Sequence, residues 1–240
     1  DAALIAVVWQ QALSAELGVA LSPGAAAVLG LSVWLSYTAD RLFDIRGRSG
    51  GDLLSTRHRF AKRRQSALWR VWAVVLLADI ALAYFMLDRA LITLGAQLLL
   101  VCLLYTALNQ CFSRYFFPKE LCVALIFTAG VCLFIPGQSL GSFAALFALL
   151  CFLNCLLIGS KELQIDRSLR VHSIAPALSR RWLGAACLLL HIMAILLAPV
   201  GAGALSLGFL MLGMLHLLRD RISTERFRVL ADGSLLLLGL

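Results

Sequence analysis

The chain has 240 residues, of which 61% are hydrophobic and only 14% are charged, and its formal net charge is +8. A soluble domain contains about 25% charged and about 45–50% apolar residues, so this composition excludes an ordinary soluble fold. The basic residues lie between long apolar runs, as in the cytoplasmic loops of membrane proteins, so the positive charge indicates membrane topology and no nucleic-acid partner.

Long apolar runs follow one another along the chain, and a helix needs about 20 such residues to cross a bilayer. We therefore expect an all-α, polytopic transmembrane bundle of about eight to nine helices, forming a single domain over residues 1–240. The predicted spans are 3–20, 25–43, 68–87, 90–108, 120–136, 141–160, 181–199 and 203–218, with a ninth that begins near Gly233 and is cut off.

The connections between these spans alternate between very short turns and long polar segments. Arg89 is the only one of the 21 Lys and Arg residues that lies in a short turn, and the others lie in or beside the long segments. Basic loops stay in the cytoplasm, so the long segments are expected there. We expect a multi-pass protein of a bacterial inner membrane. The short turns are 21–24, 88–89, 137–140 and 200–202, and the long segments are 44–67, 109–119, 161–180 and 219–232.

Acidic pairs occur at the cytoplasmic ends of two predicted spans. Asp40 and Asp44 follow the second span, and Glu162 and Asp166 follow the sixth. A spacing of four residues places both carboxylates of a pair on one face of a helix, where two like charges destabilise it unless a cation compensates. Magnesium held by carboxylates and by substrate phosphates is such a cation.

Basic residues lie beside both acidic pairs. Arg41 follows Asp40 directly, and Lys119 precedes the fifth span on the same membrane face; Lys161 and Arg167 flank the second pair. Carboxylates together with Lys and Arg suit a diphosphate bridged by Mg²⁺. The alternative is that these acids are ordinary helix-end charges that pair with loop arginines.

The stretch Ser36–Asp44, SYTADRLFD, with its long basic loop and the second acidic pair, resembles the UbiA superfamily of intramembrane prenyltransferases. That resemblance implies nine helices and two Asp-rich motifs, NDxxDxxxD and DxxxD, that hold Mg²⁺ and a prenyl diphosphate. It makes the expected catalytic and metal-binding residues Asp40, Asp44, Glu162 and Asp166, and the expected substrate-binding residues Arg41, Tyr37, Tyr105, Lys119, Lys161 and Arg167.

Several positions depart from the family pattern. Ser36 and Tyr37 stand where the first motif has Asn and Asp, and Glu162 replaces an aspartate of the second motif. Gly159 stands where longer versions carry another acid, and Asn109 replaces the lysine of a YxxxK element that Tyr105 begins. About half of the family's metal carboxylates are therefore absent.

The expected function is Mg²⁺-dependent transfer of a prenyl group from a prenyl diphosphate to a lipophilic acceptor within the membrane, with an aromatic compound as one candidate acceptor. Two alternatives stay open: a terpene cyclase of the same superfamily, and a non-catalytic protein that binds prenyl lipids.

Two further features allow more than one interpretation. Asp79, near the middle of the third span, serves either the substrate cavity or a structural hydrogen bond, because an acid at that depth costs about 2.5–3.5 kcal/mol without a partner. The basic run 57–64 either contacts anionic lipid or covers the diphosphate site.

Overall fold

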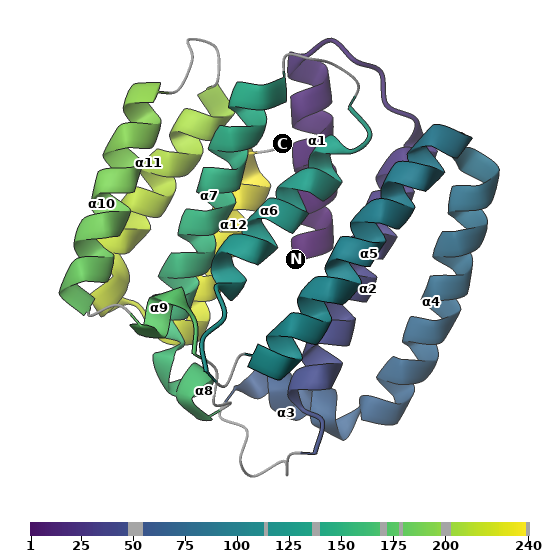
Figure 1. Cartoon of the computed structure of the whole chain (residues 1–240). Coiled ribbons are helices and arrows are strands. Elements are labelled where there is room, and N and C mark those ends of the chain that lie inside the picture. Colours follow the sequence, from purple (N-terminus) through teal and green to yellow (C-terminus); the bar gives the residue numbers. More distant parts are fainter. Residues whose placement is uncertain are drawn as a thin grey trace.

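The computed structural model describes residues 1–47, 55–112, 115–135, 140–168, 172–177, 180–197 and 203–238. These residues form helices and contain no strand, as the apolar runs predicted (Figure 1). The helices are α1 (Ala2–Glu16), α2 (Pro23–Asp44), α3 (Thr56–Arg63), α4 (Gln65–Met86), α5 (Arg89–Phe112), α6 (Lys119–Cys132), α7 (Leu140–Lys161), α8 (Leu163–Ser168), α9 (Ile174–Ala177), α10 (Arg180–Leu197), α11 (Gly203–Leu218), the 3₁₀ turn η2 (Arg219–Arg221) and α12 (Thr224–Leu238).

Local sequence signals fix the first hairpin. Gly18 adopts a positive φ of 65° just after α1, a conformation that costs glycine little and that ends the helix before the predicted residue 20. The side chain of Ser22 accepts a hydrogen bond from the backbone N–H of Ala25, and Pro23 occupies the first turn, so α2 begins with a capped end.

Helix α7 lies at the centre of the second half of the bundle. It packs against α6, α10, α11 and α12, while α1 packs against α2, α6 and α12. The side chains of Trp9, Phe147, Phe209 and Phe227 are fully buried in the core between these helices. The indole N–H of Trp9 donates to the carbonyl of Leu235 at 2.8 Å, which ties α1 to α12.

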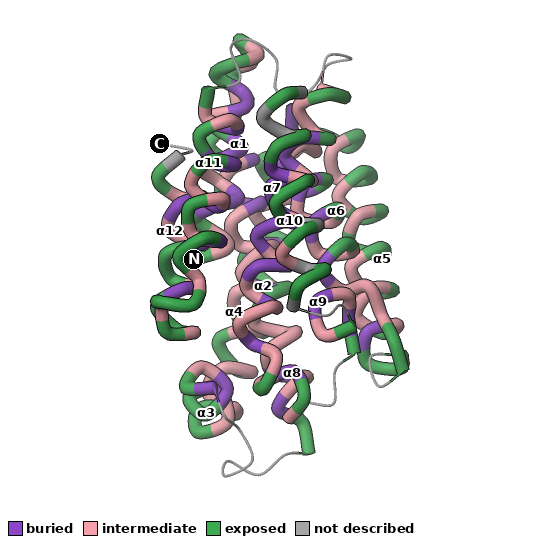
Figure 2. Tube along the Cα trace, turned by 90° about the vertical axis from the view of Figure 1, so that its left-hand side faces the viewer, coloured by how far each residue is buried: buried purple, intermediate pink, exposed green. Residues whose placement is uncertain are grey.

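The outer helices carry apolar surface that suits a bilayer. Within the described residues, four helices are long and apolar enough to cross a membrane: α4, α5, α7 and the continuous segment Gly203–Arg221. Side chains such as Val74, Leu77 and Leu100 on α4 and α5 are exposed, and Figure 2 shows exposed and intermediate residues along both helices. The chain is thus a membrane-embedded helical bundle, and the count of eight to nine spans stays a prediction.

Short helices gather at one end of the bundle. Helices α3, α8 and α9, which belong to segments predicted as loops, lie together at the lower end in Figure 1, where α2 and α7 also end. The predicted turns at 200–202 and, apart from Leu140, at 137–140 lie outside the described residues.

The last helix begins earlier than the sequence analysis expected. Residues 219–232 were predicted as a loop with a span from Gly233 onward, but α12 already begins at Thr224. The polar residues of its first turns hid it, because Arg228 and Asp232 face a cavity in the bundle while Phe227 and Ala231 are buried in the core.

Candidate functional site

A cavity of about 430 Å³ opens among α2, α5, α6, α7, α8 and α12. All four predicted carboxylates line it, so the two acidic pairs, more than 100 residues apart in sequence, face one space. Of the six predicted substrate-binding residues, the cavity is lined by Tyr37, Arg41, Tyr105 and Lys119.

The second acidic pair spans a break between two helices. Helix α7 ends at Lys161, Glu162 follows it, and Asp166 lies on α8. The backbone N–H of Asp166 still bonds to the carbonyl of Glu162 at 2.9 Å, and that of Glu162 to Ile158 at 3.0 Å. The helical spacing of the two carboxylates therefore survives the break, and both reach the cavity.

Cations from three other elements neutralise this second pair. The Arg57 guanidinium on α3 lies 2.6 Å from a Glu162 oxygen, and Arg228 on α12 lies 3.7 Å from the other oxygen. The Lys119 ammonium on α6 lies 2.9 Å from Asp166 Oδ1. Burial raises the pKa of the Asp166 carboxyl, and the charge and hydrogen bond of Lys119 oppose that rise.

The first acidic pair differs from the second at Asp40. Asp40 Oδ1 is buried and accepts no hydrogen bond among the described residues. Asp44 lies 3.8 Å from the His58 ring on α3. An acceptor oxygen left without a donor costs about 1–3 kcal/mol, so Asp40 is poised to gain from a cation that enters the cavity.

Glu120 was not predicted, and it organises the mouth of the cavity. It is only 2% exposed, and its carboxylate accepts hydrogen bonds from the Ser173 hydroxyl at 2.6 Å and from the N–H groups of Ile174 and Ala175. These bonds hold α9 against α6 and α7. Glu120 directly follows Lys119, a predicted substrate-binding residue, and this position is the sequence feature that could have indicated it.

Gly159 explains one departure from the family motif. A side chain there would place its Cβ 2.9 Å from the Cβ of Ala175 on α9, closer than real contacts allow. The third acid of longer motifs therefore does not fit unless α9 moves.

Lys161 and Arg167 lie apart from the other four predicted substrate-binding residues. The Lys161 ammonium donates to the carbonyls of Arg219 at 2.7 Å and Ile222 at 2.8 Å, so it closes the turn between α11 and α12. Arg167 is exposed, and neither residue lines the cavity. Each directly precedes or follows an acid in sequence, and neighbouring residues on a helix point about 100° apart, so adjacency did not imply a shared site.

The structure also places three other residues or segments considered in the sequence: Asn109, Asp79 and the basic run 57–64. Asn109 lines it from α5, four residues after Tyr105. Asp79 accepts a hydrogen bond from the Ser32 hydroxyl at 2.7 Å and does not line the cavity, which favours the structural interpretation. The basic run divides: Arg57 and His58 face the cavity, whereas Arg59 and Arg63 are exposed.

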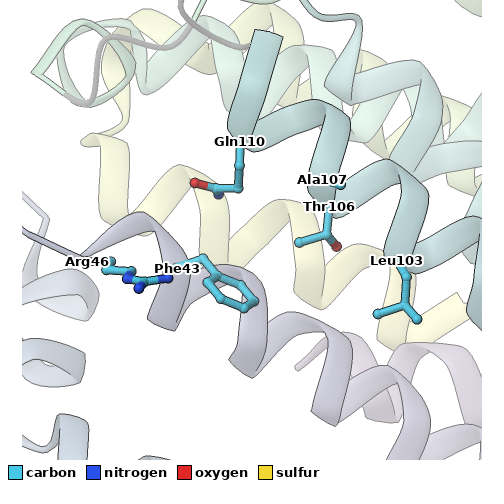
Figure 3. Close-up of a pocket in the computed structure, with 6 residues that line it drawn as sticks. All are labelled: Phe43, Arg46, Leu103, Thr106, Ala107 and Gln110. Atoms are coloured by element: carbon cyan, nitrogen blue, oxygen red, sulfur yellow. The ribbon is translucent and has the colours of Figure 1, made fainter.

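A second pocket of about 450 Å³ lies on the flank of the bundle between α2 and α5. Figure 3 shows Phe43 on α2 and Arg46 just after this helix, with Leu103, Thr106, Ala107 and Gln110 on α5 across the pocket. Its lining, taken over the described ranges, contains one charged side chain, Arg46, and no acid. The cavity with the acidic pairs is lined by carboxylates, cations and aromatic rings, and it is therefore the candidate site.

The donor set decides which metal site is possible. Among the described residues, no three His, Cys, Asp or Glu side chains lie close enough to hold a metal ion by themselves. Mg²⁺, however, usually keeps water and substrate phosphates and takes only one or two protein carboxylates. Asp40 and Asp166 each have a buried oxygen that accepts no hydrogen bond from any residue the structure describes, so they fit a site in which water and phosphate complete the Mg²⁺ shell.

Comparisons with known proteins address the fold. No protein-family model matches the chain, and no curated protein matches it either. Among solved structures, it is similar to the apo structure of a UbiA homolog from Aeropyrum pernix K1, with a TM-score of 0.67 and 15% sequence identity over 99% of this chain and 95% of that one. The resemblance noted from the acidic motifs is thus confirmed for the three-dimensional structure, and the chain has the fold of a UbiA homolog.

Proposed function

We propose that the chain is a member of the UbiA superfamily that transfers a prenyl group from a prenyl diphosphate to a lipophilic acceptor in a Mg²⁺-dependent reaction. One observation carries this proposal: the carboxylates of both acidic pairs and Lys119 line one cavity. If the two acidic motifs served only as helix-end charges, their positions around one cavity would remain unexplained.

The cavity mouth has the charges that a metal diphosphate needs. Asp40 and Asp44 from α2 and Glu162 and Asp166 from α7 and α8 are the proposed Mg²⁺ ligands, shared with phosphate oxygens and water. Bound Mg²⁺ would neutralise charge on the departing diphosphate. Arg41, Arg57 and Lys119 line the same mouth and would stabilise that leaving group electrostatically.

The negative charges of Glu162 and Asp166 are already neutralised by cations before any diphosphate binds. Arg57 pairs with Glu162, and Lys119 pairs with Asp166. We propose that both cations exchange these carboxylates for phosphate oxygens when Mg²⁺ enters with the substrate. Such an exchange keeps every charge of the mouth paired in both states, which matters because an unpaired buried charge costs several kcal/mol.

The inner cavity suits a prenyl chain. Its apolar lining includes Ile5, Ala124, Phe127 and Leu235, which lie deeper in the bundle than the acids. Trp34 and Tyr37 line the wall on α2, and aromatic rings attract a cation by about 0.5–2 kcal/mol. They would therefore favour the allylic carbocation that forms as the diphosphate leaves.

The proposed topology places the long helices across a bacterial inner membrane with the cavity mouth in the cytoplasm. The exposed basic residues Arg59 and Arg63 on α3, and Arg64 directly after it, support that orientation through the positive-inside rule.

Binding and turnover can be tested separately with purified protein in detergent. The experiment measures binding of labelled geranylgeranyl diphosphate with and without Mg²⁺, and pyrophosphate release with and without an added acceptor. The proposal predicts Mg²⁺-dependent binding that Asp40→Ala and Asp166→Ala abolish and that Asp220→Ala, an exposed acid outside the cavity, leaves intact.

The alternatives give different results in the same assay. A terpene cyclase would release pyrophosphate and form a cyclic product without an acceptor. A non-catalytic binder would hold the ligand regardless of Mg²⁺ and release no pyrophosphate. Binding that ignores both Mg²⁺ and the Asp40 and Asp166 substitutions would rule out the proposed site.

A further inference from the structure

The cavity contains a second group of polar residues, deeper than the acidic pairs. Asp232 on α12 and Asn154 on α7 both line it, and the two helices pack against each other. Asn154 precedes Glu162 by eight residues, so at about 1.5 Å per residue it lies about 12 Å farther along α7 from the mouth. This group is therefore separate from the carboxylates proposed to bind Mg²⁺.

The inner group offers hydrogen-bond acceptors to the cavity. The Asn154 side chain lies beside the Asp232 carboxylate and interacts with it electrostatically. Asn154 is only 7% exposed, yet its Oδ1 atom has no hydrogen-bond partner among the described residues. Arg228, one turn before Asp232, is directed to Glu162 at the mouth.

A purely structural role explains this arrangement incompletely. An acid within a membrane helix costs several kcal/mol, and such residues face a cavity or a partner. A structural pair would satisfy both side chains, but the Asn154 oxygen remains unpaired beside the Asp232 carboxylate. Two acceptors that face one cavity match a ligand group that donates a hydrogen bond.

We propose that Asp232 and Asn154 form the acceptor-binding end of the cavity and select an acceptor with a neutral hydroxyl group over one with a carboxylate. This inference rests on the proposed function, because it assumes that the mouth holds the prenyl diphosphate. The hydroxyl donates to Asp232, whereas a carboxylate would meet a like charge and offer no proton. Sites built to bond a substrate hydroxyl discriminate strongly against groups that leave them unpaired.

The test uses 2-naphthol and 2-naphthoate, which share a ring system and differ in the polar group. Their equilibrium binding to the full chain in lipid nanodiscs is measured at neutral pH with Mg²⁺ and a non-cleavable farnesyl thiolodiphosphate, after subtraction of binding to empty nanodiscs. The expected result is binding of 2-naphthol about tenfold tighter or better. Asp232→Asn and Asn154→Ala should each reduce that ratio about fivefold or more, with thiolodiphosphate affinity unchanged.

Matched controls separate this inference from the proposed function. Asp220→Asn removes an exposed acid outside the cavity and should leave the ratio intact. If thiolodiphosphate binds with Mg²⁺ but the wild-type protein does not prefer 2-naphthol, or the ratio ignores both inner substitutions, the acceptor assignment is wrong and the proposed function stands. If thiolodiphosphate does not bind, the proposed function fails and the acceptor assignment fails with it. Should Asp232→Asn not fold, the ratio in Asn154→Ala, which leaves Asp232 in place, decides between these outcomes.

Discussion

The two acid-bearing ends of the bundle differ in how their charges are compensated. At the end of α7 and on α8, Glu162 and Asp166 pair with cations from three elements, α3, α6 and α12. At the end of α2, Asp40 keeps a buried oxygen that accepts no hydrogen bond from the part of the chain that the structure describes, and the His58 ring on α3 lies 3.8 Å from Asp44. Glu162 and Asp166 thus bind cations from distant segments, whereas Asp40 presents an oxygen to the cavity.

This difference suggests a division of labour within one site. The cation-paired acids hold the mouth together before ligand binds, because breaking a buried pair leaves a costly unpaired charge. The less paired Asp40 gains most when a metal arrives. We therefore expect substitutions at the α2 end to affect ligand binding most, and substitutions around Asp166 to affect stability more.

The largest effect is expected at the first pair. Asp40→Asn should weaken Mg²⁺-dependent prenyl diphosphate binding by about 100-fold or more, since second-shell partners of metals alone are worth about 10–100-fold. Its melting temperature should stay equal or rise, because the substitution removes a buried charge. If Asp40→Asn instead lowers the melting temperature sharply and retains binding, Asp40 serves stability and not ligand binding, contrary to this expectation.

Loss of the cation at the second pair should mainly destabilise the fold. Lys119→Met leaves the buried Asp166 carboxylate without its partner and should cost about 3 kcal/mol in thermal unfolding in detergent. Adding Asp166→Asn should recover most of that loss. Arg59→Met, which removes an exposed charge on α3, is the matched control and should change stability little. An unchanged melting temperature in Lys119→Met contradicts the expected role of the ion pair.

The tight contact at Gly159 predicts a smaller loss. Gly159→Asp restores the acid of longer motifs, but its Cβ would lie 2.9 Å from that of Ala175, which should cost about 2 kcal/mol of stability. Combining it with Ala175→Gly opens the Cβ contact and should recover part of the melting temperature, since the new carboxylate still lies near the buried Glu120 carboxylate. If Gly159→Asp is as stable as the parent, α9 is not held as the Glu120 hydrogen bonds indicate.

The smallest effect is a pH dependence at Asp166. Burial raises its pKa, against the lowering effect of Lys119, so the folded protein holds a proton where the unfolded chain has lost it. Asp166 therefore contributes stability at low pH that is lost as pH rises from about 4 toward the raised pKa. Melting temperatures across that window should fall less steeply in Asp166→Asn. Identical slopes in both proteins speak against the shift.

The spans and the two acidic ends were predictable because their signals are local. Long apolar runs mark α4, α5 and α7, and the four-residue spacing of the acids brought both members of each pair to one cavity. The start of α12 was missed because its cavity-facing Arg228 and Asp232 made an inward helix face look like a loop.

Long-range partners could not be read from the sequence. Lys161 bonds to carbonyls near η2, and Glu120 caps α9, through contacts between residues more than 50 positions apart. Neither contact follows from a local pattern, because only the packing of α6, α7 and α9 brings those groups together. The same holds for Arg57, whose partner Glu162 comes from the other half of the chain.

The most direct test of the central claim, that both acidic ends hold one metal diphosphate, is a Mg²⁺ titration of farnesyl thiolodiphosphate binding. It compares the parent with Asp40→Asn, Glu162→Gln and the double variant. We expect each single substitution to remove most of the Mg²⁺ dependence, and the double variant to lose less than the sum of the two free-energy losses. Binding that keeps its Mg²⁺ dependence in either single variant would contradict a shared site.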